Sequence, residues 1–221
     1  MAGRLVGAFL GLVMLAAAGA GAGYLVGRED VEEPVTFAVP EAVPAEQPSF
    51  PVNVYDVTPD PDATPLDGGL ALHEEKFRAG GFKLRAPAPD GWQRVELSGR
   101  TQWNFTPADR VPNTYLLRIG IVAGERKSPS VETTSRIFAL RQQETDGNSE
   151  NLIIEEQSDS AFTATTIVGG YQRVIMERFL TAPGNSSAYF TVVMNGREVD
   201  RDAMTELIDR VVAGAFVPGT D

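Results

Sequence analysis

The apolar residues of this chain follow two different patterns. Residues 5–26 form an unbroken apolar run that contains no charged side chain. From about residue 68 onward the apolar residues are periodic instead, with the two-residue alternation of strands and the three-to-four-residue spacing of helices. Residues 29–67, which lie between, are rich in proline and acidic side chains. We therefore divide the chain into residues 1–28, a linker over 29–67 and a globular domain over 68–221.

Alternating apolar and polar residues predict an antiparallel sheet of about six strands, preceded by a hairpin. The hairpin covers residues 76–85 and turns at Gly80 and Gly81, because glycine tolerates the backbone angles of tight turns. The strands are expected at residues 91–97, 102–105, 114–122, 151–155, 171–180 and 188–195.

A first helix is predicted from its end signals. Ser128 is a suitable N-cap, Pro129 suits the first helical position, and Asp146-Gly147 ends the helix. Its apolar face is expected to consist of Val131, Thr134, Ile137 and Phe138.

The last helix has the clearest apolar stripe in the chain. Asp200 is the expected N-cap and Gly214 the expected end. The stripe consists of Met204, Leu207, Ile208, Val211 and Val212. It needs an apolar surface to pack on, and the sheet is the only candidate.

Together these elements favour an α+β domain, with an antiparallel sheet and two main helices. Too few helices alternate with strands for a doubly wound fold. The domain has about 150 residues, which is enough chain to bury one hydrophobic core.

Several segments of the domain carry a resemblance to a known fold. They are FKLRAPAPDGW (residues 82–92), NTYLLRIGIV (113–122), GGYQRVIMERF (169–179), SAYFTVVMNG (187–196) and GAFVP (214–218). In this order they resemble the PsbP-like fold, and in particular the actinobacterial cell-envelope proteins of the LpqN/LpqT type. The resemblance covers roughly residues 76–218 and implies a domain that binds protein partners or lipid-like envelope ligands. Proteins of the LpqN type are usually anchored by a lipidated cysteine, whereas this chain has no Cys.

The apolar run over residues 5–26 is predicted to be a single transmembrane anchor in place of that lipid. As a helix it would be about 33 Å long, close to the roughly 30 Å of a bilayer core. The alternative is a cleaved signal peptide, with cleavage after Ala20 or Ala22. Arg4 and Arg28 flank the run almost symmetrically, so the orientation is weakly determined. We expect the domain outside the cytoplasmic membrane, with a cytoplasmic domain as the alternative.

Three glycines in and directly after this run recur at four-residue spacing, namely Gly19, Gly23 and Gly27. Small residues on one helix face permit close approach of two helices, so one option is a homodimer through this face. The alternative is a chance spacing in a run rich in alanine and glycine.

The negative charge of the chain, −11 at pH 7, is concentrated in the linker. Residues 29–67 contain ten acidic residues, eight prolines and no Lys or Arg. Like charges repel and proline removes backbone donors, so we expect an extended, disordered tether. A sequence pI near 4.6 argues against a nucleic-acid partner.

Catalytic and metal-binding motifs are not apparent. His73 is the only histidine, and no G-x-S-x-G motif or further set of metal ligands accompanies it. The adjacent acids Glu74 and Glu75 would point to opposite faces of a strand, so they would not form an acid–base pair. We expect no catalysis, no cofactor and no metal.

Trp92 and Trp103 are the candidate ligand-binding residues. Both are bulky side chains near one edge of the predicted sheet, where aromatic groups could line an apolar groove. The alternative is that they pack in the core.

These features predict a membrane-tethered, extracytoplasmic binding or accessory domain of the cell envelope that is not an enzyme. It would recognise a protein partner or a lipid-like ligand. The alternative is a sensory or regulatory ectodomain, which would act through a partner membrane protein because only four residues precede the predicted anchor. A hydrolase is a third class, for which the sequence shows no nucleophile–base pair.

Overall fold

The computed structural model describes residues 53–61, 64–97, 101–108, 114–122, 125 and 127–218, which belong to one compact unit. Within these residues no helix is both long and apolar enough to cross a bilayer. The predicted anchor over residues 5–26, with Gly19, Gly23 and Gly27, lies outside the described residues.

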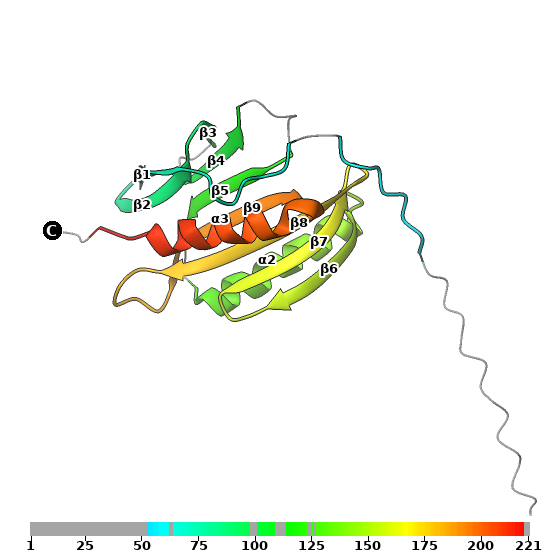
Figure 1. The fold of residues 1–221 in the computed structure, drawn as a ribbon. Coiled ribbons are helices and arrows are strands. Elements are labelled where there is room, and N and C mark those ends of the chain that lie inside the picture. Colours follow the sequence, from blue (N-terminus) through cyan, green and yellow to red (C-terminus); the bar gives the residue numbers. More distant parts are fainter. Residues whose placement is uncertain are drawn as a thin grey trace, which may run out of the picture. The chain divides into compact units, whose positions relative to one another are not determined.

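Seven strands form one antiparallel sheet in the order β3-β4-β5-β9-β8-β7-β6 (Figure 1). β1 (Leu72–Ala79) and β2 (Phe82–Pro89) form a separate two-stranded hairpin. The strands of the large sheet are β3 (Trp92–Glu96), β4 (Gln102–Pro107), β5 (Leu116–Ile121), β6 (Glu150–Gln157), β7 (Ala161–Val168), β8 (Tyr171–Thr181) and β9 (Ala188–Arg197).

The prediction of about six strands was too low, because β7 was missed. β7 has the sequence AFTATTIV, and all of its residues between the first and the last are buried. A strand that is covered on both faces shows no alternation of apolar and polar side chains, so its pattern does not stand out. The hairpin and the other strands are confirmed, each within a few residues of its predicted bounds.

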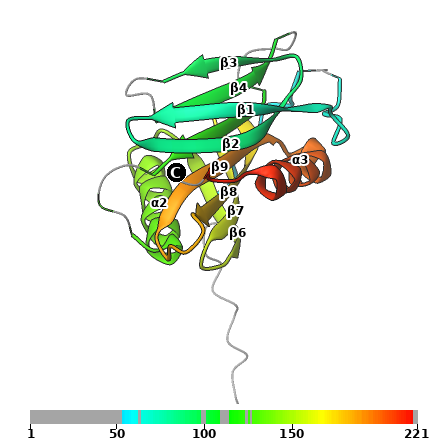
Figure 2. The ribbon, with the colours of Figure 1, turned by 90° about the vertical axis from the view of Figure 1, so that its left-hand side faces the viewer.

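Two main helices cover the two faces of the sheet. α3 (Arg201–Gly214) and the β1–β2 hairpin pack on one face, and α2 (Pro129–Thr145) packs on the other. Figure 2 shows α2 and α3 on opposite sides of strands β6–β9. A short 3₁₀ turn, η1 (Glu198–Asp200), leads into α3. The domain is therefore α+β, with a large antiparallel sheet and two main helices.

The start and end of α2 are as predicted, but its buried face is not. The Ser128 hydroxyl accepts a hydrogen bond from the Val131 amide at 3.4 Å, and Gly147 has a φ of +73° just after the helix. Phe138 is 63% exposed, although it was expected in the core. It follows Ile137 by one residue and is thus rotated about 100° away from the buried side. The buried face consists of Thr133, Ile137 and Leu140.

The apolar stripe of α3 and the N-cap position of Asp200 are confirmed, but the side chain of Asp200 does not cap the helix. Met204, Leu207, Ile208 and Val211 are fully buried against β9, β8 and β2. The Asp200 side chain makes no capping bond to the helix. It is buried, and it accepts hydrogen bonds from other parts of the chain instead.

Part of the predicted linker contacts the domain. The Thr58 amide donates to the Gly170 carbonyl at 2.8 Å, in the turn between β7 and β8. Leu66 is buried, and its amide donates to Asp200 Oδ1 at 3.0 Å. The compact unit therefore begins at Asn53, ahead of the boundary expected at residue 68.

Candidate ligand-binding groove

A groove of about 530 Å³ lies on the α2 face of the large sheet, beside the area that α2 covers. It arises from the pleat, since every second residue of a strand points to the same face. Cross-strand pairing aligns Leu116, Asn195 and Ile175 in one row across β5, β9 and β8. Ile175 also belongs to the apolar cluster under α2, so the groove borders that helix. The volume falls in the range of ordinary small-ligand sites.

The walls of the groove combine apolar and uncharged polar side chains. Asn104 and Thr106 come from β4, and Thr166 and Val168 come from β7. Asn195 carries the most unusual feature, because its Oδ1 is buried and accepts no hydrogen bond from the described residues. A buried acceptor without a donor costs about 1–3 kcal/mol. This oxygen is covered as the side chain stands, so a ligand N–H or O–H group would recover part of this cost once the Asn195 amide turns its oxygen toward the groove.

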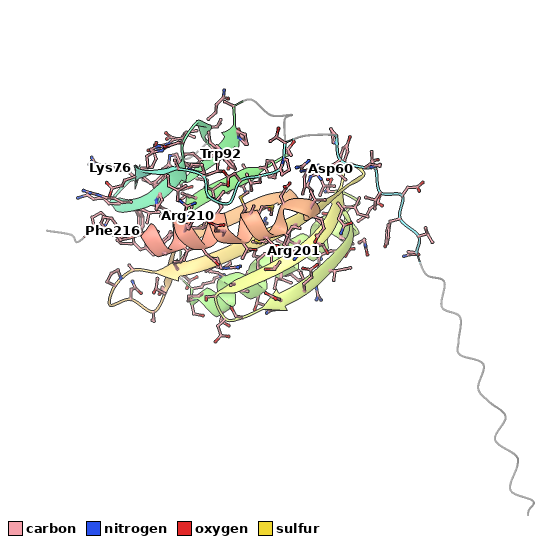
Figure 3. The ribbon with its side chains drawn as sticks, viewed as in Figure 1. Asp60, Lys76, Trp92, Arg201, Arg210 and Phe216 are labelled. Carbon is pink, nitrogen blue, oxygen red and sulfur yellow. The ribbon has the colours of Figure 1, made fainter. Side chains whose placement is uncertain are left out.

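The mouth of the groove carries a positive charge. Arg173 of β8 lines the groove and is 15% exposed, with its guanidinium 5.0 Å from the centre of the Tyr171 ring. Its Nη1 lies 2.7 Å from Oδ1 of Asp60, which belongs to the predicted linker. Figure 3 labels Asp60 near the end of the sheet where β7 and β8 meet. Pro61, the next residue, also lines the groove.

A buried charge network borders the groove. Glu177 of β8 accepts hydrogen bonds from Arg136 of α2 at 3.0 Å and from Thr191 of β9 at 3.1 Å. Burial raises the pKa of Glu177, and these two donors offset part of that effect. Arg118 of β5 donates to Asn104 Oδ1 at 2.9 Å, which fixes the amide of a groove residue.

Two arginines and one acid thus meet in this network. Burial lowers the pKa of Arg118, and the nearby charge of Arg136 lowers it further. Glu177 acts in the opposite direction on the pKa of Arg118. The network leaves one positive charge in excess beside the groove, which would favour a negatively charged ligand.

One end of the groove is formed by Tyr115 and Gly196. A side chain at Gly196 would meet Met204 Sδ at 2.5 Å and the Tyr115 ring at 2.7 Å. The absence of a side chain at Gly196 therefore lets α3 and Tyr115 approach β9 closely.

The two tryptophans predicted as ligand-binding residues do not line this groove. Trp103 is 1% exposed and packs on Phe77, with 4.8 Å between ring centres. Trp92 is half-buried and packs against the same core, on the face that the β1–β2 hairpin covers. Their position agrees with the core-packing alternative.

His73 lies on β1 in a surface cluster of charges. Its Nδ1 is 2.6 Å from Asp90 Oδ1, and its Nε2 is 3.2 Å from Glu75 Oε1. Hydrogen bonds to Glu75 and Asp90 raise the pKa of His73. Glu75 also pairs with Arg94 at 2.8 Å. Within the described residues, no group of three His, Asp or Glu side chains is arranged to hold a metal ion.

Sequence reasoning missed the groove residues, although β4 carried a signal. In QWNFTP, Trp103 and Phe105 alternate with Asn104 and Thr106. The aromatic set faces the core, so the small polar set between them had to face the other way. Arg173 and Asn195 lie in segments that were predicted as strands. They line the same groove only because β8 pairs with β9, which the sequence does not show.

No model of a protein family matches this chain, and no curated protein matches it significantly. Solved structures include similar ones. The cyanobacterial PsbP protein CyanoP of Synechocystis sp. PCC 6803 is 14% identical, with a TM-score of 0.47, over 67% of this chain and 94% of its own. LpqN of Mycobacterium tuberculosis, described as involved in cell envelope biogenesis, is 13% identical, with a TM-score of 0.39, over 67% of this chain and 92% of its own.

The Ran-binding protein Mog1p of Saccharomyces cerevisiae is similar as well. It is 9% identical, with a TM-score of 0.45, over 66% of this chain and 96% of its own. These structures include a PsbP protein and LpqN, the two kinds of protein that the sequence motifs resemble.

Proposed function

We propose that this protein is a non-enzymatic binding domain of the cell envelope, whose ligand occupies the groove on the α2 face of the sheet. The observation that carries the proposal is the groove itself. It combines an open volume of about 530 Å³ with a buried, unpaired acceptor on Asn195. Such a site selects a ligand by shape and by a few polar contacts.

The side chains around the groove suit binding better than catalysis. Its titratable members are Tyr115, Tyr171 and Arg173. Tyr115 donates to Asp200, Arg173 pairs with Asp60, and the Arg173 guanidinium lies over the Tyr171 ring. His73 lies on β1, a strand that contributes no residue to the groove. We therefore expect no turnover of ester, peptide or glycan substrates. Turnover that disappears in a His73→Ala variant would contradict this part of the proposal.

The proposal includes tethering to the outer face of the cytoplasmic membrane through residues 5–26. Its basis is the uncharged apolar run, which has the length of a bilayer span. The protein should stay with membranes after an alkaline carbonate wash. A soluble protein whose mass shows a start at Gly21 or Gly23 would mean that the run is a cleaved signal peptide.

A regulatory ectodomain is the second candidate, and the contacts of the linker favour it. Asp60 reaches Arg173 at the mouth of the groove, and Pro61 lines the groove. A ligand that enters here would disturb these contacts and change how the domain is held. A partner membrane protein would then carry the signal.

Filling the groove tests the proposal. Val168 lines the groove and is 46% exposed, whereas Val95 of β3 lies outside the groove and is 50% exposed. Val168→Trp should abolish co-purification of the protein or lipid that wild type carries from crosslinked membranes. Val95→Trp adds the same bulk at a similar exposure and should retain it. Equal retention by both variants would contradict the proposal.

A further inference from the structure

The mouth of the groove already holds an extended peptide with an acidic side chain, namely the chain's own residues 58–61. Two contacts hold this segment: the Thr58 amide donates to the Gly170 carbonyl at 2.8 Å, and Asp60 pairs with Arg173 at 2.7 Å. The first contact binds a backbone N–H, and the second binds a carboxylate two residues later. The site therefore accepts a ligand with these two groups at this spacing.

We infer that Gly170 and Arg173 form a recognition site for an extended acidic peptide of a partner protein, and that residues 58–61 occupy it until the partner displaces them. The inference rests on the proposed function, because the displaced site opens into the same groove. It adds the class of ligand and a competing segment within the chain itself.

In the contact between Asp60 and Arg173, another carboxylate can take the place of Asp60. Arg173 Nη1 donates a hydrogen bond to the Gln172 carbonyl at 2.7 Å. Asp60 Oδ1 accepts no hydrogen bond from the described residues, so charge attraction holds it without hydrogen-bond geometry. Both side chains are partly exposed, at 22% for Asp60 and 15% for Arg173. A carboxylate that approaches with better geometry can therefore replace Asp60.

The chain's own segment leaves most of the groove unused. Of residues 53–61, Pro61 alone lines it. Asn195 Oδ1 stays without a donor, and Leu116, which is only half-buried, stays open to contact. A tethered segment has an effective concentration on the order of millimolar. A partner peptide overcomes this advantage through the additional contacts that it makes further inside.

The unpaired Asn195 acceptor favours a peptide over an anionic lipid. A peptide presents a backbone N–H at almost every residue, and one such group can donate to Asn195. An acyl chain in the same place has no donor and would leave the buried oxygen unsatisfied. The anionic lipid is therefore the alternative that the experiment has to exclude.

The experiment uses the full chain in phosphatidylcholine nanodiscs and a fluorescein-labelled synthetic peptide with the sequence of residues 53–61. Fluorescence anisotropy measures binding. Asp60→Asn should bind the peptide about fivefold more tightly than wild type, because the competing segment is weakened. Asp56→Asn is the matched control, since Asp56 is an exposed carboxylate on the same segment, and it should bind like wild type.

Two further arms test the partner contact. Arg173→Gln, combined with Asp60→Asn, should weaken peptide binding about tenfold, since the peptide carboxylate loses its cation. The same loss is expected when the peptide itself carries Asn at the position of Asp60. This second arm uses folded Asp60→Asn protein, so it remains decisive if Arg173→Gln does not fold.

Three results would overturn the inference. They are unchanged peptide affinity in Asp60→Asn, unchanged affinity for the Asn-substituted peptide, and loss of peptide binding when phosphatidylglycerol is added to the nanodiscs. A failure of this inference can be distinguished from a failure of the proposed function. If the peptide tests fail but Val168→Trp still loses the ligand that co-purifies with wild type, the groove binds something other than an acidic peptide. If the peptide tests fail and Val168→Trp keeps that ligand, both proposals fail.

Discussion

The Tyr115 hydroxyl donates a hydrogen bond to Oδ2 of Asp200, and this contact joins the groove to the start of α3. Arg197 completes the cluster, because its Nε lies 2.9 Å from the Tyr115 oxygen and 2.7 Å from Asp200 Oδ2. Burial would raise the pKa of Asp200, but the donors from Tyr115, Arg197 and the Leu66 amide outweigh it and lower that pKa. The same carboxylate, at the start of α3, thus holds together the linker, Tyr115 just before β5, and the end of β9.

Removal of the Tyr115 hydroxyl should destabilise the domain. Tyr115→Phe keeps the ring but leaves the buried Asp200 carboxylate with one donor fewer, so we expect a loss of about 1–3 kcal/mol in the free energy of unfolding. Urea denaturation followed by circular dichroism measures this loss. Tyr55→Phe, at the edge of the described domain, serves as the control and should unfold like wild type. A Tyr115→Phe variant with wild-type stability would show that Asp200 does not depend on this donor.

The stability gained from Tyr115 should disappear at alkaline pH. Burial is the largest cause that raises the pKa of Tyr115, to about 12, followed by its hydrogen bond to Asp200. The folded state therefore holds this proton more tightly than the unfolded state, whose pKa is near 10. The contribution is present in full below pH 10 and is lost as the pH rises from about 10 to about 12.

Tyrosinate absorbance checks this shift directly. The late phase of the wild-type titration should be missing in Tyr115→Phe. The difference in unfolding free energy between the two proteins should narrow over the same pH interval. A titration difference centred near pH 10 would mean that Tyr115 is accessible to solvent.

The two helices should respond differently to truncation of an apolar side chain. Leu207→Ala on α3 should cost about 2–5 kcal/mol, because the side chain is fully buried. Phe138→Ala on α2 should cost less than about 1 kcal/mol, since Phe138 is 63% exposed. Thermal melts of both variants compare the two sites. A large loss in Phe138→Ala would mean that α2 buries the face expected from the sequence.

Local patterns in the sequence were enough to predict much of the fold. The stripe from Met204 to Val211 and the Ser128-Pro129 helix start act within one element, so a few neighbouring residues define them. Strand β7 was not predicted because burial on both faces removes the two-residue alternation of apolar and polar side chains. On α2, apolarity suggested Phe138, whereas the helix buries Thr133 on the same face as Ile137.

The groove could not be predicted from the sequence because it depends on contacts between distant residues. Asp60 and Arg173 meet only after the β7–β8 turn is placed, and the row of Leu116, Asn195 and Ile175 exists only in the paired sheet. The size of Trp92 and Trp103 suggested a ligand site. Large aromatic side chains are just as common in protein cores, and Trp103 lies in the core.

Photo-crosslinking at the groove tests the central claim most directly. A small aliphatic amino acid with a photoreactive diazirine, close to valine in size so that it leaves the groove open, replaces Val168 in one protein and Val95 in another, both expressed in the native membrane. The two positions are similarly exposed, but only Val168 lines the groove. If the groove is the binding site, irradiation yields a defined adduct at Val168 and none at Val95, and mass spectrometry identifies the adduct as a peptide or a lipid. Equal labelling at both positions, or labelling at Val95 alone, would contradict the account.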